Sequence, residues 1–257
     1  MIRILCVAAL AACLPMTPSL AQTAVSAAAP DIVVVPCRTH DADREKADAT
    51  LRDKAFGLMQ AHDLGALTKL LPDLDAALTR APNVAPAVEQ CGDKLNIYSR
   101  NLADYTVVTS AVMAQKRPGV TGTVMLMPLP YARIAWEIGW VYYEQHDLTK
   151  AIAAFEKGLP NDPQDTVLAG EYANALEQDG QNAKALAFVN AFIAANPNLA
   201  DSEHAVMLRR RGYALGELGH YDDAIAAYNE SLKYVPNNAM ALNEITYNKQ
   251  QKALHAK

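Results

Sequence analysis

The C-terminal half of the chain repeats itself with a period of 34 residues. Pro163 and Pro197 end two successive units 34 residues apart, and Pro236 ends a third unit after an insertion of five residues near 200–204. A unit this short cannot bury its apolar face alone, so such self-similarity predicts a solenoid of stacked units. The units are expected at 132–165, 166–199 and 205–238.

Composition favours helices. Alanine, the strongest helix former, is the most frequent residue, aromatic residues make up 7% of the chain, and a hydrophobic fraction of 51% is enough for a core. The sequence therefore predicts an all-α fold. The net charge of −5, from 23 basic and 28 acidic residues, gives no electrostatic reason to bind nucleic acid or an anionic membrane surface.

Within each unit, small residues recur at the eighth and twentieth places and a larger one at the twenty-fourth. The first unit holds Gly139, Ala151 and Phe155 there, the second Ala173, Ala185 and Val189, and the third Gly212, Ala224 and Tyr228. Small residues let paired helices approach closely while the larger residue fills the space beside them. This spacing resembles the tetratricopeptide repeat (TPR). The fourth place departs from the family pattern, since Ala135, Ala169 and Leu208 stand where tryptophan is usual.

The resemblance implies an α-solenoid of antiparallel helix pairs, in which the first helix of each pair lines a groove that binds a peptide or protein segment. Carried over by position, the candidate groove residues are Arg133, Trp136, Trp140, Tyr143, Glu144, Asn174, Glu177, Arg209, Tyr213, Asn243 and Tyr247. Tryptophan, tyrosine and arginine most often anchor interfaces. The three successive arginines 209–211 differ by about 100° per residue around the helix, so at most one or two can point into the groove, and Arg209 is the favoured one. The clamp that some family members use for a partner's C-terminal carboxylate is not expected, because its lysines and second asparagine are missing.

An alternative applies to the tryptophans. Trp136 and Trp140 lie four residues apart on one helix face and could instead pack under neighbouring N-terminal elements. Those elements are a long helix over 86–116, predicted from the 3-4 spacing of apolar residues, and an apolar connector at 117–131, which is rich in proline and glycine. In that case the tryptophans belong to the core and do not bind a partner.

The remaining segments complete the expected architecture. The helical pattern over 43–61 and 65–79 predicts two helices, the second kinked or divided at Pro72. Together with 86–116 they form an N-terminal helical region, 43–116, in which 43–82 could be a degenerate repeat. A polar-faced helix at 239–254 is expected to cap the solenoid.

The first residues read as a targeting signal. Arg3 precedes an uncharged apolar stretch that ends before Pro15, and the small residues around Ala21 favour cleavage there, which makes 1–21 a signal peptide and 22–42 a flexible or extended lead. The expected location is the bacterial periplasm. A second interpretation treats Cys13 as the lipidated cysteine of an outer-membrane lipoprotein. No segment is long enough to predict a membrane-spanning helix.

Removal of the signal leaves two cysteines, Cys37 and Cys91. In an oxidising compartment they are expected to form a disulfide. They are too few for a zinc site and too far apart for a Cys-x-x-Cys redox pair.

Catalytic motifs for nucleophilic, phosphate-binding or metal-dependent chemistry do not occur in the sequence. We therefore expect no enzyme activity, no cofactor and no metal, and a protein or peptide as partner. The expected role is an adaptor, scaffold or assembly factor in the cell envelope. Two alternatives stay open: an enzyme, or an enzyme's regulatory subunit, that uses the N-terminal region, and a structural solenoid that associates with itself.

Overall fold

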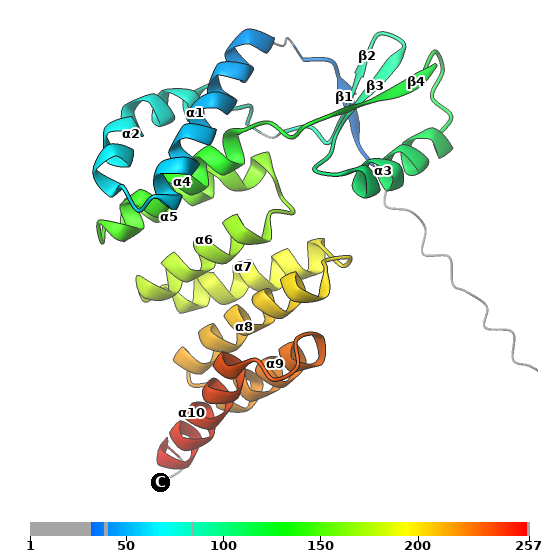
Figure 1. Cartoon of the computed structure of the whole chain (residues 1–257). Helices are drawn as coiled ribbons and strands as arrows, with labels where there is room; N and C mark the ends of the chain where they lie inside the picture. The colour runs from blue at the N-terminus through cyan, green and yellow to red at the C-terminus, as the bar shows by residue number, and fades with distance from the viewer. Residues whose placement is uncertain (1–31, 39–40, 84, 256–257) are drawn as a thin grey trace, which may run out of the picture. The chain divides into compact units, whose positions relative to one another are not determined.

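Three helix hairpins follow one another in the C-terminal half of the protein, in the computed structural model that describes residues 32–38, 41–83 and 85–255 (Figure 1). They are α4 (Tyr131–Glu144) with α5 (Leu148–Gly158), α6 (Thr166–Gln178) with α7 (Asn182–Ala195), and α8 (Asp201–Glu217) with α9 (Tyr221–Tyr234), followed by α10 (Ala239–His255). A short 3-10 turn, η1 (Leu159–Asn161), follows α5. The predicted TPR-type α-solenoid is confirmed.

Close helix contact within the hairpins occurs at the small residues that the repeat pattern singled out. A Cβ atom added to Gly139 would overlap the ring of Phe155, and one added to Gly212 would lie 2.8 Å from the Tyr228 ring. Both rings are almost fully buried. The ring at the twenty-fourth place therefore occupies the space that glycine leaves at the eighth.

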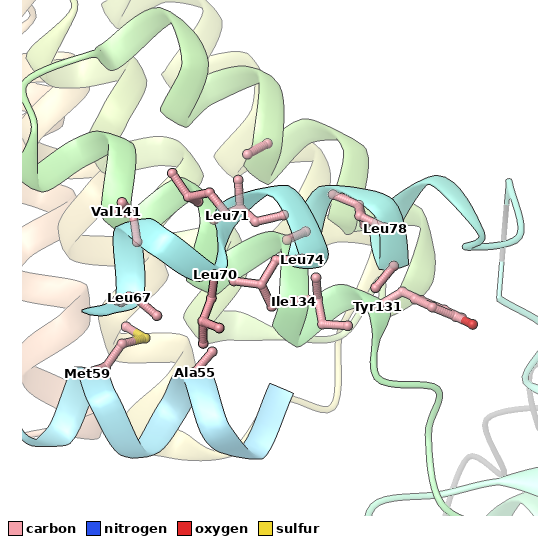
Figure 2. Close-up of a cluster of buried hydrophobic side chains, with 14 of the residues drawn as sticks. Ala55, Met59, Leu67, Leu70, Leu71, Leu74, Leu78, Tyr131, Ile134 and Val141 are labelled. Carbon is pink, nitrogen blue, oxygen red and sulfur yellow. The ribbon is translucent and has the colours of Figure 1, made fainter. Parts of the chain in front are cut away.

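A fourth hairpin lies in the N-terminal half, formed by α1 (Ala42–Gln60) and α2 (Leu64–Thr79). The two helices share a hydrophobic cluster with α4, which includes Ala55, Leu67, Leu74 and Ile134 (Figure 2). α2 is one helix that runs through Pro72, so of the two outcomes predicted there, a kink or a division, the division is wrong.

All four hairpins have the same turn. The backbone N–H of Asp63 donates to the carbonyl of Leu58, and equivalent bonds of 2.8 to 3.0 Å run from Asp147 to Tyr142, from Gln181 to Leu176 and from His220 to Leu215. A residue with positive φ precedes each donor: His62, His146, Gly180 or Gly219. The α1–α2 hairpin is thus built like the other three.

A small sheet combines one strand that precedes α1 with three strands inserted between α2 and α4; we call it the inserted sheet. It has four strands in the order β1 (Val34–Pro36), β2 (Val88–Cys91), β3 (Lys94–Tyr98) and β4 (Gly122–Leu126). The β1–β2 and β3–β4 pairs are parallel, and β2 and β3 are antiparallel with Val88 opposite Ile97. The helix α3 (Leu102–Ala114) covers one face, where Val112 packs with Val88, Leu95 and Ile97.

The long helix predicted over 86–116 is therefore wrong. Heptad-like spacing of apolar residues is also compatible with strands when alternate side chains are buried, as Leu95 and Ile97 are. Gly92, with φ of 63°, makes the β2–β3 turn, and Asn101 caps α3 by accepting from the Asp104 N–H at 2.9 Å. The connector 117–131 is not helical before Tyr131, as predicted, but it contains strand β4, which was not predicted.

The predicted signal peptide 1–21, Cys13 and most of the lead 22–42 lie outside the described residues; the rest of the lead includes β1 and the start of α1. From Ile32 onward the chain forms one compact unit. Among the helices that the structure describes, none combines the length and apolarity needed to cross a membrane.

Candidate functional site

The candidate residues lie on the first helix of each C-terminal repeat, which is α4, α6 or α8, and on α10. We call the surface formed by these four helices the first-helix face. An open groove of about 370 Å³ lies on this face between α6 and α8. Gly170 is buried beside Val206, since an added Cβ would lie 3.8 Å from a Val206 methyl group. Glu171, Glu203 and the half-exposed Val167 also line the groove. The groove therefore combines apolar side chains with carboxylates.

A chain of hydrogen bonds crosses the first-helix face from α4 to α8. The Asn174 amide Nδ2 donates to the Tyr143 hydroxyl at 3.2 Å, and its Oδ1 accepts from Arg210 Nη1 at 3.0 Å. The same Arg210 nitrogen lies 2.9 Å from Glu177 Oε2. Arg210, which was not among the candidates, thus joins the candidates Asn174 and Glu177, and Asn174 in turn bonds the candidate Tyr143.

Arg210 lines the groove and bonds two candidate residues, although it was not among the candidates itself. The sequence favoured Arg209, but Arg210 reaches the groove and the α6 side chains. Arg209 is half-buried, its Nη1 atom has no hydrogen-bond partner among the described residues, and burial and the nearby Arg210 lower its pKa. The structural reason for the Arg210 contact is the buried carboxylate of Glu177 on the preceding first helix, which requires a positive partner and whose burial the sequence does not specify.

Burial controls the ionisation of the first-helix face. It raises the pKa of Glu177 to about 7, although Arg210 opposes the shift. Burial also raises the pKa of Tyr213, and the carboxylates of Glu217, Glu177 and Glu244 add to that shift. Tyr213 therefore lies on the acidic part of this face, between α6 and α10.

The tryptophans are half-buried. Trp140 packs against the cluster shared by α1, α2 and α4, and Trp136 contacts both that cluster and the next one, formed around α5 and α6. The Arg133 guanidinium lies 4.7 Å from the centre of the Trp136 ring. Both tryptophans thus pack against the core, but beside α1 and α2 and not under a long 86–116 helix.

The last three candidates lie at the surface. Glu144 is exposed at the end of α4, and Asn243 and Tyr247 are exposed on α10. They do not join the hydrogen-bond chain that runs from Tyr143 to Arg210.

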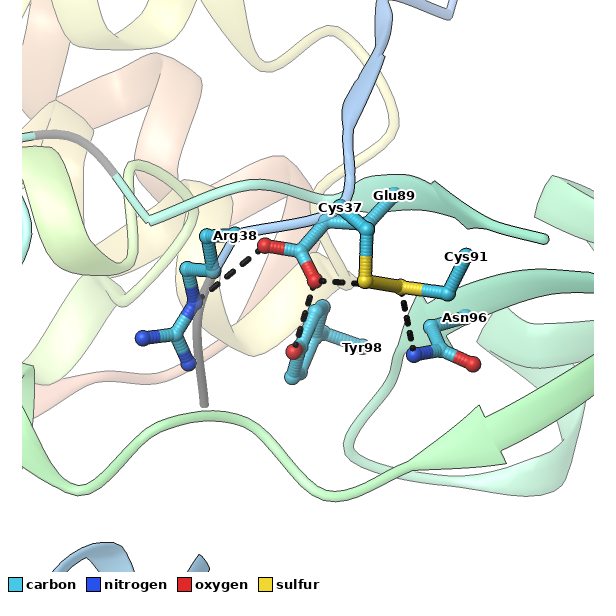
Figure 3. The surroundings of a disulfide bond; sticks show 6 residues. All are labelled: Cys37, Arg38, Glu89, Cys91, Asn96 and Tyr98. Carbon is cyan, nitrogen blue, oxygen red and sulfur yellow. Dashed lines mark hydrogen bonds and ion pairs between the residues drawn. A yellow bond between two sulfur atoms is a disulfide. The ribbon is translucent and has the colours of Figure 1, made fainter. Parts of the chain in front are cut away.

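Cys37 and Cys91 form the predicted disulfide, with their Cα atoms 4.7 Å apart. It connects the ends of the parallel strands β1 and β2, so Cys91 lies in a strand and not in the helix predicted over 86–116 (Figure 3). Beside it, the buried Glu89 carboxylate lies 3.2 Å from Arg38 Nε and accepts from the Tyr98 hydroxyl at 3.3 Å. Arg38 also donates to Glu45 at 2.7 Å, which connects the sheet to α1.

Among the described residues, a cluster of atoms that could bind a metal ion lies at this disulfide. The ligand atoms of Cys37, Glu89 and Cys91 lie within 4.8 Å of one another. Both sulfur atoms belong to the disulfide, so the group offers no thiolate while the bond is intact. Burial raises the pKa of Tyr98 to about 12, which keeps its hydroxyl protonated as a donor to Glu89.

Comparisons with known proteins agree with this architecture. Two family models described as tetratricopeptide repeat match residues 128–166 and 205–238. A search of curated proteins found no match.

Similar solved structures include the first TPR of Spaghetti (RPAP3) bound to an HSP90 peptide, at 30% identity over 48% of this chain and 93% of that one, with a TM-score of 0.42. The first TPR domain of human RPAP3 is 29% identical over 48% of this chain and 94% of that one, with a TM-score of 0.44. MamA AMB-1 is 16% identical over 80% of this chain and 89% of that one, with a TM-score of 0.48.

The two matched segments coincide with the α4–α5 and α8–α9 hairpins, whose glycine and aromatic places carry the repeat pattern. The chain belongs to the tetratricopeptide repeat family.

Proposed function

We propose that this protein is an exported, periplasmic adaptor or assembly factor that binds an extended peptide segment of a partner protein on its first-helix face. It acts by binding and carries out no chemistry of its own. The observation that carries the proposal is the groove between α6 and α8, where exposed Val167 and half-buried Val206 lie beside Glu171, Glu203 and Arg210. One TPR domain at 30% identity is described as bound to an HSP90 peptide, which is consistent with this use of the face.

The charges of the groove favour a particular kind of peptide. Arg210 is engaged by Asn174 and Glu177, whereas Glu171 and Glu203 lie on the groove lining. Glu203 accepts from the Thr166 hydroxyl at 3.0 Å and caps α8, which fixes its position. A segment with apolar side chains and a positive charge is complementary to this surface.

A peptide-library experiment tests the proposal. The protein without residues 1–21 is screened against unstructured peptides, and the affinity of the best binders is compared among variants. Val167→Lys changes an exposed groove residue and should weaken binding at least tenfold. Asn190→Lys places the same charge on the exposed surface of α7, outside the groove, and should leave affinity unchanged. Equal affinities of the two variants, or no peptide binding, would overturn the proposal.

Export is supported by the disulfide, because disulfides persist in oxidising compartments. Cell fractionation, with the mass of the N-terminal peptide of the recovered protein, tests it. A periplasmic protein that begins after Ala21 is expected. A lipid on Cys13 or a cytoplasmic chain with an intact Met1 would contradict it.

Self-association is a second candidate, favoured by exposed apolar side chains on the inserted segment. Leu102, Val107 and Met127 are each more than two-thirds exposed, and apolar surface of this kind can be covered by a second copy of the chain. Light scattering across a range of concentrations tests this function. Self-association predicts a mass that rises with concentration and falls back to that of a monomer in Val107→Lys.

A further inference from the structure

A second cavity, separate from the groove between α6 and α8, lies where the inserted sheet meets the end of the first repeat. Its volume is about 160 Å³. One wall is the segment after β3, with Ser99 and Arg100, and the other is the end of η1, with Asn161 and Asp162. The Ala85 N–H donates to the Pro160 carbonyl at 3.1 Å, which connects the two walls beside the cavity.

Two buried polar side chains in this cavity have no hydrogen-bond partner among the residues that the structure describes. Ser99 is 4% exposed and its Oγ atom is unpaired; Asn161 is 5% exposed and its Oδ1 atom is unpaired. Buried polar atoms are nearly always hydrogen-bonded, because an unpaired one keeps the cost of losing water. Both atoms belong to residues that line one cavity, so a single bound group could satisfy both.

The charges around the cavity favour a cation. Asp162 and Asp104 supply two carboxylates against one guanidinium, that of Arg100. Outside the lining, Asp165 and Arg133 add one charge of each sign near Asp162, so the balance stays negative; burial and Asp165 raise the pKa of Asp162, while Arg100 and Arg133 oppose the shift. An anionic ligand would meet both carboxylates, and a neutral apolar ligand would leave Ser99 and Asn161 unpaired. The rest of the lining is mostly apolar, with Pro86, Val108 and Leu129, beside the polar side chains of Tyr98 and Gln164.

We propose that this cavity binds a primary ammonium group carried on a short alkyl chain. An ammonium has three N–H donors, and Ser99 Oγ, Asn161 Oδ1 and the Asp162 carboxylate offer three acceptors. A cavity of roughly 150 Å³ is known to accept a benzene molecule, so a chain of about five heavy atoms fits. The side chain of lysine has this size, and so does a free alkylamine.

Binding of small probes to the protein without residues 1–21 tests the proposal, with NMR chemical shifts as the readout. The probes are n-butylammonium, n-butanol and butyrate, which share their chain length and differ in charge. Butylammonium should bind at least tenfold more tightly than butanol, and butyrate should not bind. Equal binding of butylammonium and butanol would overturn the proposal. No binding of either probe would also overturn it, because ordered water would then be the group that fills the cavity.

Matched variants locate the site. Asp162→Asn removes the charge with little change of shape and should weaken butylammonium binding at least tenfold, whereas Asp73→Asn, on the exposed surface of α2, should not. Ser99→Ala should weaken it at least threefold. The chemical shifts also report whether each variant is folded; if Asp162→Asn is not, Ser99→Ala decides. Unchanged affinity in a folded Asp162→Asn or Ser99→Ala variant overturns the assignment.

The source of the ammonium is distinguished with the blocked peptide acetyl-Ala-Lys-Ala-amide and its Nε-acetyl-lysine form. Binding of the lysine peptide tenfold more tightly than butylammonium assigns the cavity to a lysine of a partner protein. Binding of butylammonium alone assigns it to a free amine. If both peptides bind, and the acetylated one binds as tightly as the unacetylated one, recognition of an ammonium is contradicted.

Discussion

Arg210 Nη1 lies 2.9 Å from Glu177 Oε2, which joins α8 to α6 across the boundary between two repeats. The Glu177 side chain is 1% exposed and that of Arg210 is 30% exposed. A carboxylate buried to this extent depends on its partner, because burial without one disfavours the charged form. The pair therefore supports both the repeat stack and the groove surface beside it.

Arg210→Met should lower the free energy of unfolding by about 1–3 kcal/mol. The change removes the charged hydrogen bond to Glu177 and leaves its carboxyl group buried without that partner. Urea denaturation at neutral pH measures the change. Lys233→Met, at an exposed position of α9, is the control and should shift stability by no more than about 0.5 kcal/mol. Adding Glu177→Gln to Arg210→Met should recover part of the loss. Equal stability of Arg210→Met and the wild type would contradict the role of the pair.

The solenoid could be predicted because its signal is local and repeated. Gly139 with Phe155 and Gly212 with Tyr228 mark the same contact at the same spacing, and each pair lies within one hairpin. The disulfide partners could be predicted because no other cysteine follows the signal. Neither inference requires knowledge of how distant segments meet.

The inserted sheet could not be predicted, since its strands are three to five residues long and pair over long distances. Val34 pairs with Val88 and Leu95 with Thr123, and nothing in the local pattern specifies these registers. The contact of Arg210 with α6 could not be predicted for a related reason. The two side chains differ by one helical step of about 100°, and which one faces α6 depends on how the helices pack.

Gly139→Ala should destabilise the protein by about 1–3 kcal/mol, because the added methyl group overlaps the Phe155 ring in a packed core. Gly57→Ala, in α1, is the control: its added Cβ would have no heavy atom within 4 Å, and the change should stabilise the protein by about 0.4–1 kcal/mol. Thermal unfolding of both variants gives the comparison. Similar effects of the two changes would show that the hairpin contact is not close in solution.

Replacing Cys37 and Cys91 together by alanine should lower the free energy of unfolding by about 4 kcal/mol, since the bond closes a loop with a sequence separation of 54. Denaturant unfolding measures the loss, and reduction of the wild type by a dithiol should reproduce it. A thiol assay on the denatured, unreduced protein without residues 1–21 should find none. Two reactive thiols would refute the disulfide.

Glu137 provides the pH-dependent prediction. It is fully buried in α4, and neither carboxylate oxygen has a hydrogen-bond partner among the described residues. Burial raises its pKa to about 9, with Arg133 and Arg52 opposing the shift and Asp53 adding to it. The folded protein therefore holds this proton more tightly than the unfolded chain does. Because its folded-state pKa is raised, the free energy of unfolding should fall as pH rises from about 4.5 towards 9.

Urea denaturation of the wild type and Glu137→Gln at pH 6 and pH 9 tests this. The variant cannot lose a proton at this position, so its stability advantage over the wild type should grow with pH, by at most about 1.4 kcal/mol per pH unit. Glu144→Gln, at an exposed position of the same helix, should follow the wild type at both pH values. A constant difference between Glu137→Gln and the wild type would mean that Glu137 is ionised in the fold. The carboxylate would then have to find a partner or water inside the α1–α4 contact.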